Sequence, residues 1–325
     1  MPLIRIFGRD NGAGLSRDLR LLEDTLAQAG CEVDIVAFGG GKGVNHLRET
    51  GLRLQRRWRG RADVQIFIER VYPRLLAIGS RNLLIPNPEW FHQDWLRHLP
   101  LFDRVLCKTA HALPIFEQLG CRATYIGFTS EDRMDAAIQR ERAFFHLAGR
   151  SSAKGTAVLL DTWRRHPEWP RLTLVQGTRK AMANPGNRAR PQPHNIDHRI
   201  GYLHDREIRQ LQNQHVFHAC PSEMEGFGHS LMEAMSVGAV ALATDGAPMN
   251  ELVQLQRGCL VTPARITNKD LSPRYFVDPD GIEDGIDRML RLDETEIHAM
   301  GAAAQAHYQQ VDADFRRRLP AAVIG

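Results

Sequence analysis

The sequence has few of the features that cross-link a chain or place it in a membrane. Its 325 residues include five cysteines, which are scattered and form no Cys-x-x-Cys pair, and this argues against a disulfide framework or a cysteine zinc site. No run approaches the ~18 apolar residues of a membrane-spanning helix. The strand-like segment at residues 3–7 is too short for the apolar core of a signal peptide. We therefore expect a cytoplasmic protein in a reducing compartment.

What remains is the composition of an ordinary globular protein. Hydrophobic residues make up 43% of the chain and charged residues 25%. A chain of 325 residues is long for one domain and comfortable for two. Short apolar runs alternate with segments of helical periodicity, which predicts an α/β fold.

The most informative stretch is a strand, a loop, a helix and a second strand between residues 216 and 243. Apolar runs at 216–220 and 239–243 predict the two strands. Between them, the loop at 225–228 leads into a mostly apolar helix that ends at Gly238. This order is typical of a βαβ crossover between parallel strands.

Two glutamates lie in and just after this loop. Gly226 and Gly228 bring backbone N–H groups close to the start of the helix, which makes a ready site for an anion. Glu225 lies in the loop, and Glu233 lies within the apolar helix, where a carboxylate is costly unless a polar group meets it. Taken alone, Glu233 would fit a helix surface equally well. Together, the residues suggest a ligand with phosphates in the middle and hydroxyls at both ends, such as a nucleotide sugar.

A second segment upstream strengthens this interpretation. Residues 145–150, Phe-His-Leu-Ala-Gly-Arg, end in Gly149-Arg150 and are followed by Lys154-Gly155. With the two glutamates eight positions apart around Gly-Phe-Gly, this pattern resembles the retaining glycosyltransferases of family 4, which have the GT-B fold. The resemblance is good from about residue 144 to 251 and weak before that. It implies two doubly wound Rossmann-like domains that face each other across a cleft.

The resemblance also implies roles for individual residues. Glu225 would face the donor sugar and Glu233 would hold the nucleotide ribose. Arg150 and Lys154 would neutralise the diphosphate, as a forked guanidinium and a compact ammonium can do together. This family needs no bound metal and no cofactor beyond its nucleotide-diphosphate sugar. Two Asp-x-Asp pairs, at residues 278–280 and 312–314, imitate a metal-binding motif but do not follow a strand of a nucleotide domain.

Further residues are predicted to contact the donor. A Gly-x-Gly turn follows the first strand, but Arg17 stands where a dinucleotide fingerprint needs its third glycine, which argues against an NAD site. In the family this turn approaches the donor phosphates, and the residue after Gly201 holds the nucleotide base. The predicted donor-binding residues are Gly12, Gly14, Gly149, Arg150, Lys154, Gly177, Tyr202, Glu225, Gly226, Phe227, Gly228, His229, Ser230 and Glu233.

The acceptor site is predicted beyond the strand at residues 82–86, because ligands bind outside the carboxyl ends of parallel strands. Asn87, Glu89 and His92 lie there. Glu89 and His92 equally fit a helix N-terminal carboxylate and a surface histidine. With that alternative open, the predicted catalytic residues are Glu225, Arg150, Lys154, His92 and Glu89.

Residues 46–74 are rich in arginine. The positions are Arg48, Arg53, Arg56, Arg57, Arg59, Arg61, Arg70 and Arg74. Such a face can be merely solvated, can dock on anionic lipid headgroups, or can meet an anionic acceptor such as nucleic acid. No RNA- or DNA-binding motif accompanies it, so nucleic acid is the less favoured partner and peripheral contact with the inner face of a membrane, or with an anionic acceptor, is favoured.

The boundaries follow from composition. Residues 128–141 lack an apolar period and predict the linker, and 181–197, rich in proline and glycine, predict a mobile loop. We expect an acceptor-side domain at 1–138, a nucleotide-sugar domain at 139–305, and helices at 281–292, 294–310 and 312–319. In the family, the terminal segment, here residues 306–325, commonly rejoins the first domain.

The predicted activity is metal-independent retaining transfer of a hexosyl or pentosyl group from a nucleotide-diphosphate sugar to an acceptor hydroxyl. The acceptor would be a glycan, a lipid-linked or another hydroxyl compound in the synthesis of cell-surface polysaccharide, glycolipid or other glycoconjugate. Two alternatives stay open: a non-hydrolysing sugar-nucleotide epimerase and a non-catalytic nucleotide-sugar-binding module. A glycoside hydrolase is less favoured, because its two carboxylates must lie roughly 5–9.5 Å apart, whereas eight helical residues, the spacing of Glu225 and Glu233, would rise ~12 Å.

Overall fold

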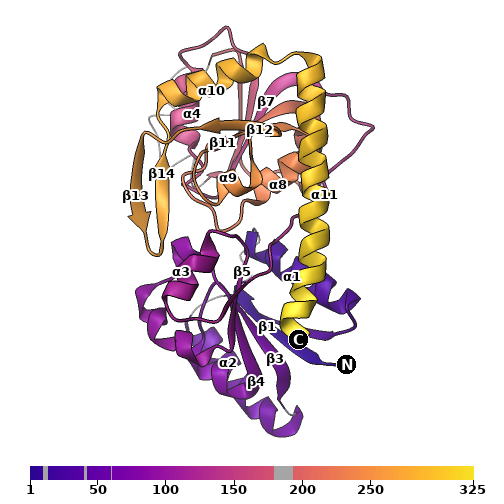
Figure 1. Cartoon of the computed structure of the whole chain (residues 1–325), viewed down its shortest axis with the longest axis vertical. Helices are drawn as coiled ribbons and strands as arrows, with labels where there is room; N and C mark the ends of the chain where they lie inside the picture. The colour runs from indigo at the N-terminus through magenta and orange to yellow at the C-terminus, as the bar shows by residue number, and fades with distance from the viewer. Residues whose placement is uncertain (10–13, 40–41, 60, 179–192) are drawn as a thin grey trace. The chain divides into compact units, whose positions relative to one another are not determined.

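The chain forms two units, seen in a computed structural model that describes residues 1–9, 14–39, 42–59, 61–178 and 193–325 (Figure 1). The N-terminal unit comprises Met1–Ser130, Lys269–Ser272 and Val311–Gly325. The C-terminal unit comprises Glu131–Asn268 and Pro273–Gln310. The division after Ser130 falls inside the segment that the sequence predicts as the linker.

The N-terminal unit is built on a six-stranded parallel sheet. Two neighbouring strands, at residues 3–9 and 62–68, are buried along most of their length on both faces, and for that reason they appear in the sequence as largely apolar runs. Their order across the sheet is β2 (Glu32–Phe38), β1 (Leu3–Arg9), β3 (Ala62–Ile68), β4 (Gly79–Ile85), β5 (Arg104–Cys107) and β6 (Ala123–Tyr125).

The first helix of this unit shows helical periodicity in its apolar residues. In α1 (Gly14–Gln28) the leucines at helical spacing, Leu15, Leu19, Leu22 and Leu26, are buried, and Gly30, with φ 82°, ends the helical segment in the left-handed conformation that glycine allows. After the strand that ends at Cys107, residues 108–111 form a turn, and the next helix begins at Ala112. The remaining elements are α2 (Lys42–Arg59), α3 (Ala112–Gln118) and the 3-10 helices η1 (Pro73–Ile78), η2 (Pro88–Trp90) and η3 (Gln93–Leu101).

The C-terminal unit contains a second six-stranded parallel sheet. Its edge strand β9 begins at Ile196, so the end of the segment predicted as a loop, residues 196–197, is strand. Most of that predicted loop, residues 181–192, lies outside the described residues. The strand order is β12 (Gly258–Val261), β11 (Val240–Thr244), β10 (His215–Cys220), β7 (Glu141–Gly149), β8 (Leu172–Gln176) and β9 (Ile196–Ile200).

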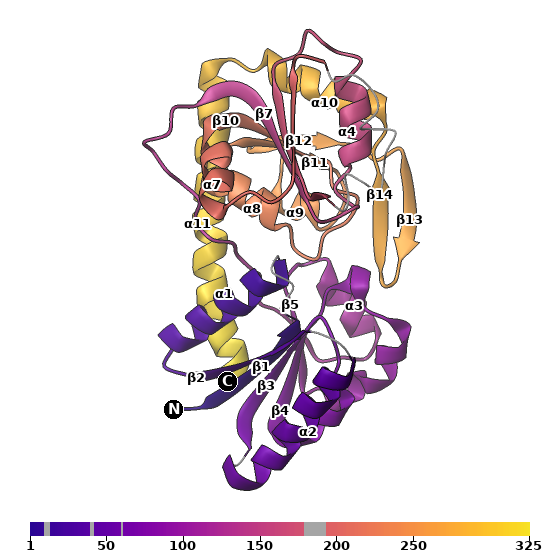
Figure 2. The same ribbon diagram turned by 180° about the vertical axis from the view of Figure 1, so that it is seen from behind.

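Helices cover this sheet and close its core. In Figures 1 and 2, α10 lies beside α4, and α8 and α9 lie together against the sheet. The ring of Phe144 packs 4.8 Å from that of Phe217 and 4.9 Å from that of Trp163, which fills the centre of the core. The helices are α4 (Thr156–Trp163), α7 (Asp205–Gln214), α8 (His229–Ser236), α9 (Met249–Leu252) and α10 (Pro279–Arg291).

Two features near the C-terminus differ from the sequence prediction. The two helices expected at 294–310 and 312–319 are one helix, α11 (Glu294–Ile324), whose last carbonyls at Ala322 and Val323 accept hydrogen bonds from Arg104 and Arg81. A hairpin of β13 (Arg265–Lys269) and β14 (Ser272–Phe276) was not expected, because its strands are short and polar. Within the described residues, no helix is long and apolar enough to cross a membrane.

Candidate active site

The predicted donor-binding residues of the C-terminal unit gather at one end of its sheet. The strand order reverses between β7 and β10, which are neighbours in the sheet. Ligands of open α/β sheets bind in the crevice at this point, outside the carboxyl ends of the strands. Residues 150–155 follow β7 and residues 221–230 follow β10. The topology therefore brings together two segments about 70 residues apart in the sequence.

The two segments meet in a polar cluster around Lys154. The Lys154 ammonium donates to the Glu225 carboxylate at 2.5 Å and to the Ser230 hydroxyl at 3.2 Å. The Ser222 hydroxyl donates to the same Glu225 oxygen at 2.6 Å. The Lys154 and Glu225 side chains are only 17% and 13% exposed, so their charges interact in a medium of low polarity.

This environment keeps Lys154 charged. Burial by itself lowers the pKa of Lys154, but the charge and the hydrogen bond of Glu225 act in the opposite direction and raise it above its ordinary value. The site thus offers a fixed ammonium with one anionic partner. The ammonium has three N–H donors, so a phosphate oxygen can accept a further hydrogen bond from it.

The backbone of these loops is packed too tightly for side chains. Gly155 has φ 66°, and a Cβ atom at this position would lie 2.1 Å from the carbonyl oxygen of Pro221. The Glu223 N–H donates to the Ala153 carbonyl at 2.9 Å, which joins the same two loops. Gly228 is the N-cap of α8 with φ 114°, a conformation that side chains rarely adopt. Glycine is therefore required at two of the motif positions.

Arg150 occupies the turn at the end of β7. Gly149 starts this turn in the left-handed conformation, with φ 54°. The Gly149 carbonyl accepts a hydrogen bond from the Gly177 N–H at 2.8 Å. A Cβ at Gly177 would come within 3.1 Å of that carbonyl oxygen and 3.4 Å of the Arg150 Cγ. Gly177 thus gives Arg150 room at the end of the sheet, and the Arg150 side chain is exposed.

Glu233 lies in the second turn of α8 and is buried, with 1% of its surface exposed. The Gln212 side-chain amide donates to the Glu233 Oε2 atom at 2.6 Å. Glu233 is therefore not a helix-surface residue, which was the alternative that the sequence left open. A buried polar partner meets its charge, as a carboxylate within a core requires.

The remaining donor-side residues lie at the ends of neighbouring elements. Tyr202 follows β9 and is 84% exposed, with its ring edge-on to His204 at 5.5 Å. Phe227 is buried and packs edge-on to the His229 ring at 5.6 Å, at the N-terminus of α8. An exposed aromatic ring suits stacking with a nucleotide base, whereas Phe227 serves to hold the loop.

In the N-terminal unit the predicted acceptor residues differ in their surroundings. His92 is exposed and its Nδ1 accepts from the Asp94 N–H at 3.2 Å, so it caps η3. Glu89 is buried in η2, and Asn87 immediately precedes this 3-10 helix. Gly14 is the first residue of α1, and Gly12 lies outside the described residues.

Glu69, at the end of β3, was missed by the sequence prediction. It has φ 61°, which is uncommon for a residue other than glycine, and Asn87 donates to its carboxylate at 3.4 Å. Burial raises the pKa of Glu69, with Lys108 acting against this effect. Lys108 forms a buried ion pair with Asp18 at 2.6 Å. The signal available was a carboxylate directly after a buried strand, at the point where the strand order reverses between β1 and β3.

The two Asp-x-Asp pairs have structural roles. Asp278 caps α10 by accepting from the Gly281 N–H at 2.9 Å. Asp312 accepts from the Thr129 hydroxyl at 2.9 Å and from Arg316 at 2.8 Å. Among the described residues, no group of three histidine, cysteine or acidic side chains is arranged to hold a metal ion.

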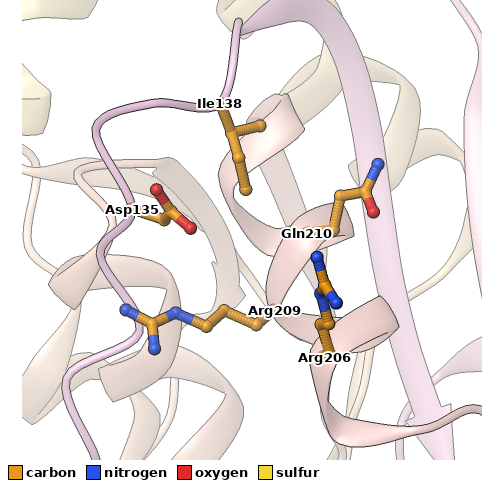
Figure 3. A pocket seen from close by; sticks show the side chains of 5 residues that line it. All are labelled: Asp135, Ile138, Arg206, Arg209 and Gln210. Atoms are coloured by element: carbon orange, nitrogen blue, oxygen red, sulfur yellow. The ribbon is translucent and has the colours of Figure 1, made fainter.

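A hollow of ≈ 170 Å³ lies between α7 and the segment before β7 (Figure 3). Arg209 in its wall donates to the carbonyls of Arg133 and Met134, so it holds the chain rather than facing a ligand. The hollow is lined by Asp135, Ile138, Arg206, Arg209 and Gln210, none of which belongs to the predicted site.

Two buried histidines support the same sheet and make it sensitive to acid. His146 bonds the Ala219 carbonyl at 2.7 Å and the Thr156 hydroxyl at 2.9 Å, while His218 bonds the Gln212 carbonyl at 3.0 Å. Burial lowers the pKa of His146 to about 4 and that of His218 to about 3. Because the unfolded chain binds these protons near pH 6.5 and the folded chain does not, their contribution to stability is complete above that pH and falls as the pH decreases towards 4 and 3.

We expect this effect to cost about 2 kcal/mol per histidine at pH 5, at roughly 1.4 kcal/mol per pKa unit. Urea unfolding of the wild type and of His146→Gln at pH 7.5 and pH 5 measures it. The variant should lose less stability than the wild type between the two pH values. Equal losses would show that His146 does not carry the effect.

Comparison with known proteins adds to this geometry. A family model described as "Glycosyl transferases group 1" matches residues 194–305. No curated protein sequence matches the chain. Among solved structures, HepE of Anabaena in complex with UDP-glucose is 15% identical, with a TM-score of 0.74 and 98% of each chain covered.

Two further structures share the fold. Sucrose-phosphate synthase of Thermosynechococcus elongatus is 13% identical, with a TM-score of 0.76 over 98% of this chain and 97% of that one. The catalytic domain of starch synthase IV of Arabidopsis thaliana, bound to ADP and acarbose, is 10% identical, with a TM-score of 0.68 over 98% of this chain and 99% of that one. The chain therefore shares the GT-B fold of these solved structures, and residues 194–305 match the group 1 glycosyltransferase model.

Proposed function

We propose that the protein is a retaining glycosyltransferase of family 4, which moves a sugar from a nucleotide-diphosphate sugar to an acceptor hydroxyl. One observation carries the proposal. Lys154, Glu225 and Ser230 converge at the N-terminus of α8, next to the point where the strand order reverses. A cation and a helix N-terminus suit a diphosphate, while the adjacent carboxylate suits sugar hydroxyls.

Each residue then has a chemical task. Lys154, Arg150 and the N–H groups at the start of α8 stabilise the negative charge that grows on the departing diphosphate. Glu225, bonded to Lys154 and Ser222, orients the donor sugar rather than attacking it. Tyr202 stacks on the nucleotide base, and Glu233 holds the ribose.

In the proposed reaction the acceptor oxygen bonds to the anomeric carbon on the face that the diphosphate leaves. The bond between the anomeric carbon and the phosphate oxygen breaks, and its electron pair stays on the phosphate oxygen. A diphosphate oxygen takes the proton of the acceptor hydroxyl. No side chain forms a covalent intermediate. Fixed cations support metal independence, because Arg150 and Lys154 meet the diphosphate charge that a divalent ion would otherwise meet.

The acceptor is proposed to bind at the N-terminal unit, near Asn87, Glu89 and His92. Asn87 is buried, and among the described residues its side-chain oxygen has no hydrogen-bond partner. A buried acceptor atom of this kind is costly unless a ligand or water meets it. A hydroxyl-rich glycan or lipid-linked acceptor would supply such a donor.

Peripheral contact with an anionic membrane is proposed through α2. Val44, Leu47 and Leu54 are 60%, 73% and 57% exposed on this helix, and the side chains of Arg48 and Arg53 are exposed beside them. Apolar residues flanked by arginines suit a surface of anionic lipids. The side chains of Arg56, Arg57 and Arg59 lie outside the described residues. Together with five unpaired cysteines, this supports a cytoplasmic place at the inner face of a membrane, where cell-surface glycoconjugates are begun.

A thermal-shift panel tests the donor site. UDP, GDP, ADP, TDP and CMP, with their common sugar conjugates, are added without metal and with magnesium. A ligand that binds only the folded protein raises the melting temperature by mass action. We expect a clear shift with one nucleoside diphosphate, without metal, that is lost in Arg150→Ala and Glu233→Ala.

Turnover then separates the activities. Transfer to an added acceptor, with the anomeric configuration of the product determined by NMR, tests retention. Interconversion of the donor without acceptor would indicate an epimerase instead, and binding without turnover would indicate a sensor module. A wild-type protein that binds none of the nucleotides would overturn the proposal.

A further inference from the structure

The buried Glu233 depends on a partner from another helix. Its carboxylate is 1% exposed within α8, and it accepts from the Gln212 amide of α7 at 2.6 Å. Gln212 is itself 1% exposed. A buried carboxylate without such a donor would bear the full cost of lost solvation. The position of Glu233 is therefore linked to the orientation of one amide.

A second contact determines which end of that amide faces Glu233. The guanidinium Nε–H of Arg133 donates to the Gln212 Oε1 atom at 3.0 Å. Since Arg133 is only a donor, it can bond the oxygen end of the amide and not the nitrogen end. The nitrogen end must then point towards Glu233. Arg133 thus fixes Gln212 as a hydrogen-bond donor to the carboxylate.

Arg133 is itself fixed. Its guanidinium forms a paired contact with the two Asp205 carboxylate oxygens, each at 2.9 Å, and its side chain is 3% exposed. Its backbone N–H donates to the Ser236 hydroxyl at 3.1 Å, and its carbonyl accepts from Asn213 at 2.7 Å. A bidentate pair of this geometry restricts both partners.

Arg133 also has an unusual place in the chain. It lies three residues after Ser130, in the segment that joins the two units and contains no helix or strand. The segment is nevertheless ordered around Arg133 by side chains of α7 and α8. The Arg133 side chain thus connects this segment to Gln212, a partner of Glu233.

We propose that Gln212 and Arg133 are positioning residues for the nucleotide, which hold the Glu233 carboxylate ready to accept the ribose hydroxyls. This inference rests on the proposed function, in which Glu233 meets the ribose. A neutral amide satisfies one carboxylate oxygen and leaves the negative charge in place. A direct arginine contact would instead neutralise that charge and occupy the carboxylate. The arginine therefore acts through the amide, and nucleotide affinity depends on the segment between the units.

The test compares nucleotide affinity with stability. Dissociation constants of UDP and ADP are measured by calorimetry for the wild type, Gln212→Leu, Arg133→Met and Glu233→Gln, together with the melting temperature of each. We expect at least tenfold weaker binding in all three variants of whichever nucleotide binds the wild type. Asp205→Asn, which removes one charge from the partner of Arg133, should weaken binding less.

Arg140→Met is the matched control. Arg140 belongs to the same joining segment, and its guanidinium donates to the Gly238 carbonyl at 3.1 Å and the His215 carbonyl at 3.4 Å. Its loss should lower the melting temperature and leave the nucleotide dissociation constant unchanged. If Arg140→Met and Arg133→Met weaken binding equally, the effect of Arg133 is general loss of stability and the inference fails.

Gln212→Glu supplies a readout that a merely structural role would not change. It places a second carboxylate beside Glu233, and two adjacent carboxylates favour sharing one proton. The charged and titratable groups around Glu233 and Gln212 include Arg133, with Asp205 behind it, Lys154, the Cys220 thiol, and His218, whose ring bonds the Gln212 carbonyl. When protonated, the introduced carboxyl group can donate as the amide did. Binding should therefore be near normal at pH 5.5 and at least tenfold weaker at pH 8, relative to the wild type at each pH.

The outcomes distinguish the positioning role of Gln212 and Arg133 from the proposed ribose contact of Glu233. Normal binding in Gln212→Leu with weak binding in Glu233→Gln overturns the positioning role of Gln212 and Arg133 and leaves the proposed donor site intact. Normal binding in Glu233→Gln, or no binding of any nucleoside diphosphate by the wild type, overturns the assignment of the ribose site and the inference with it. A pH-independent affinity of Gln212→Glu would also contradict the positioning role of Gln212, even if Arg133→Met failed to fold.

Discussion

Replacement of Lys154 by methionine is expected to lower the rate of sugar transfer by at least about 10²–10³-fold, the usual cost of removing one preorganised donor from a developing negative charge. Lys154 Nζ lies 2.5 Å from Glu225 and 3.2 Å from Ser230, so methionine removes a charge at the centre of the cluster. Steady-state kinetics with the donor identified by the thermal-shift panel would measure the loss. The decrease should appear in kcat, because the leaving diphosphate carries more charge in the transition state than in the bound donor.

Stability has to be separated from catalysis in this experiment. Methionine at position 154 leaves the mostly buried Glu225 carboxylate without its ammonium, at a cost of about 1–3 kcal/mol. The double variant Lys154→Met/Glu225→Gln removes both charges and should recover most of this stability without recovering transfer. If Lys154→Met retained the wild-type rate, the proposed role of the cluster would be wrong.

A second large effect is expected from a single methyl group. Gly155→Ala should destabilise the C-terminal unit by about 3–5 kcal/mol or prevent its folding, comparable with the most damaging core substitutions. The added Cβ would lie 2.1 Å from the Pro221 carbonyl oxygen, and backbone has to move to relieve this contact. The left-handed backbone at φ 66° adds a further 1–2 kcal/mol, roughly, for a residue with a Cβ.

Gly120→Ala is the control for that prediction. Gly120 has a similar φ of 79°, but a Cβ there would meet no atom within 4 Å. Its substitution should therefore show only the conformational cost of about 1–2 kcal/mol. Denaturant unfolding of both variants, followed by circular dichroism, distinguishes the two contributions. Equal effects would show that the contact with Pro221 is relieved without cost.

The close approach at Gly155 also explains why the motif carries glycine beside its lysine. The loop after β7 packs on the loop after β10, and the Ala153 carbonyl accepts the Glu223 N–H between them. Arg274 of β14 donates to the Glu223 carboxylate at 2.7 Å and steadies the same loop from the hairpin side. Lys154 and Glu225 are thus held by backbone contacts on either side of the ion pair that they form.

Most of the fold could be predicted because it follows from local patterns. The leucines of α1 repeat at helical spacing, and strands such as β10 and β11 are short apolar runs between glycines and polar turns. Errors arose where local signals were weak. The strands β13 and β14 carry too many polar residues to stand out, and α11 continues through residue 311, where no apolar period distinguishes one helix from two.

The sequence by itself indicated the parallel α/β architecture and the loops that we propose to bind the donor, because both depend on patterns of residues close to one another along the chain. Only the tertiary structure decided which side chains meet. Glu225 pairs with Lys154, which is 71 residues away, and Glu233 is held through Gln212 by Arg133, which is 79 residues from Gln212. Such contacts depend on the strand order, which brings residues distant in the sequence together, and on burial. Where the fold excludes water, opposite charges attract more strongly and buried polar atoms need hydrogen-bond partners within the protein.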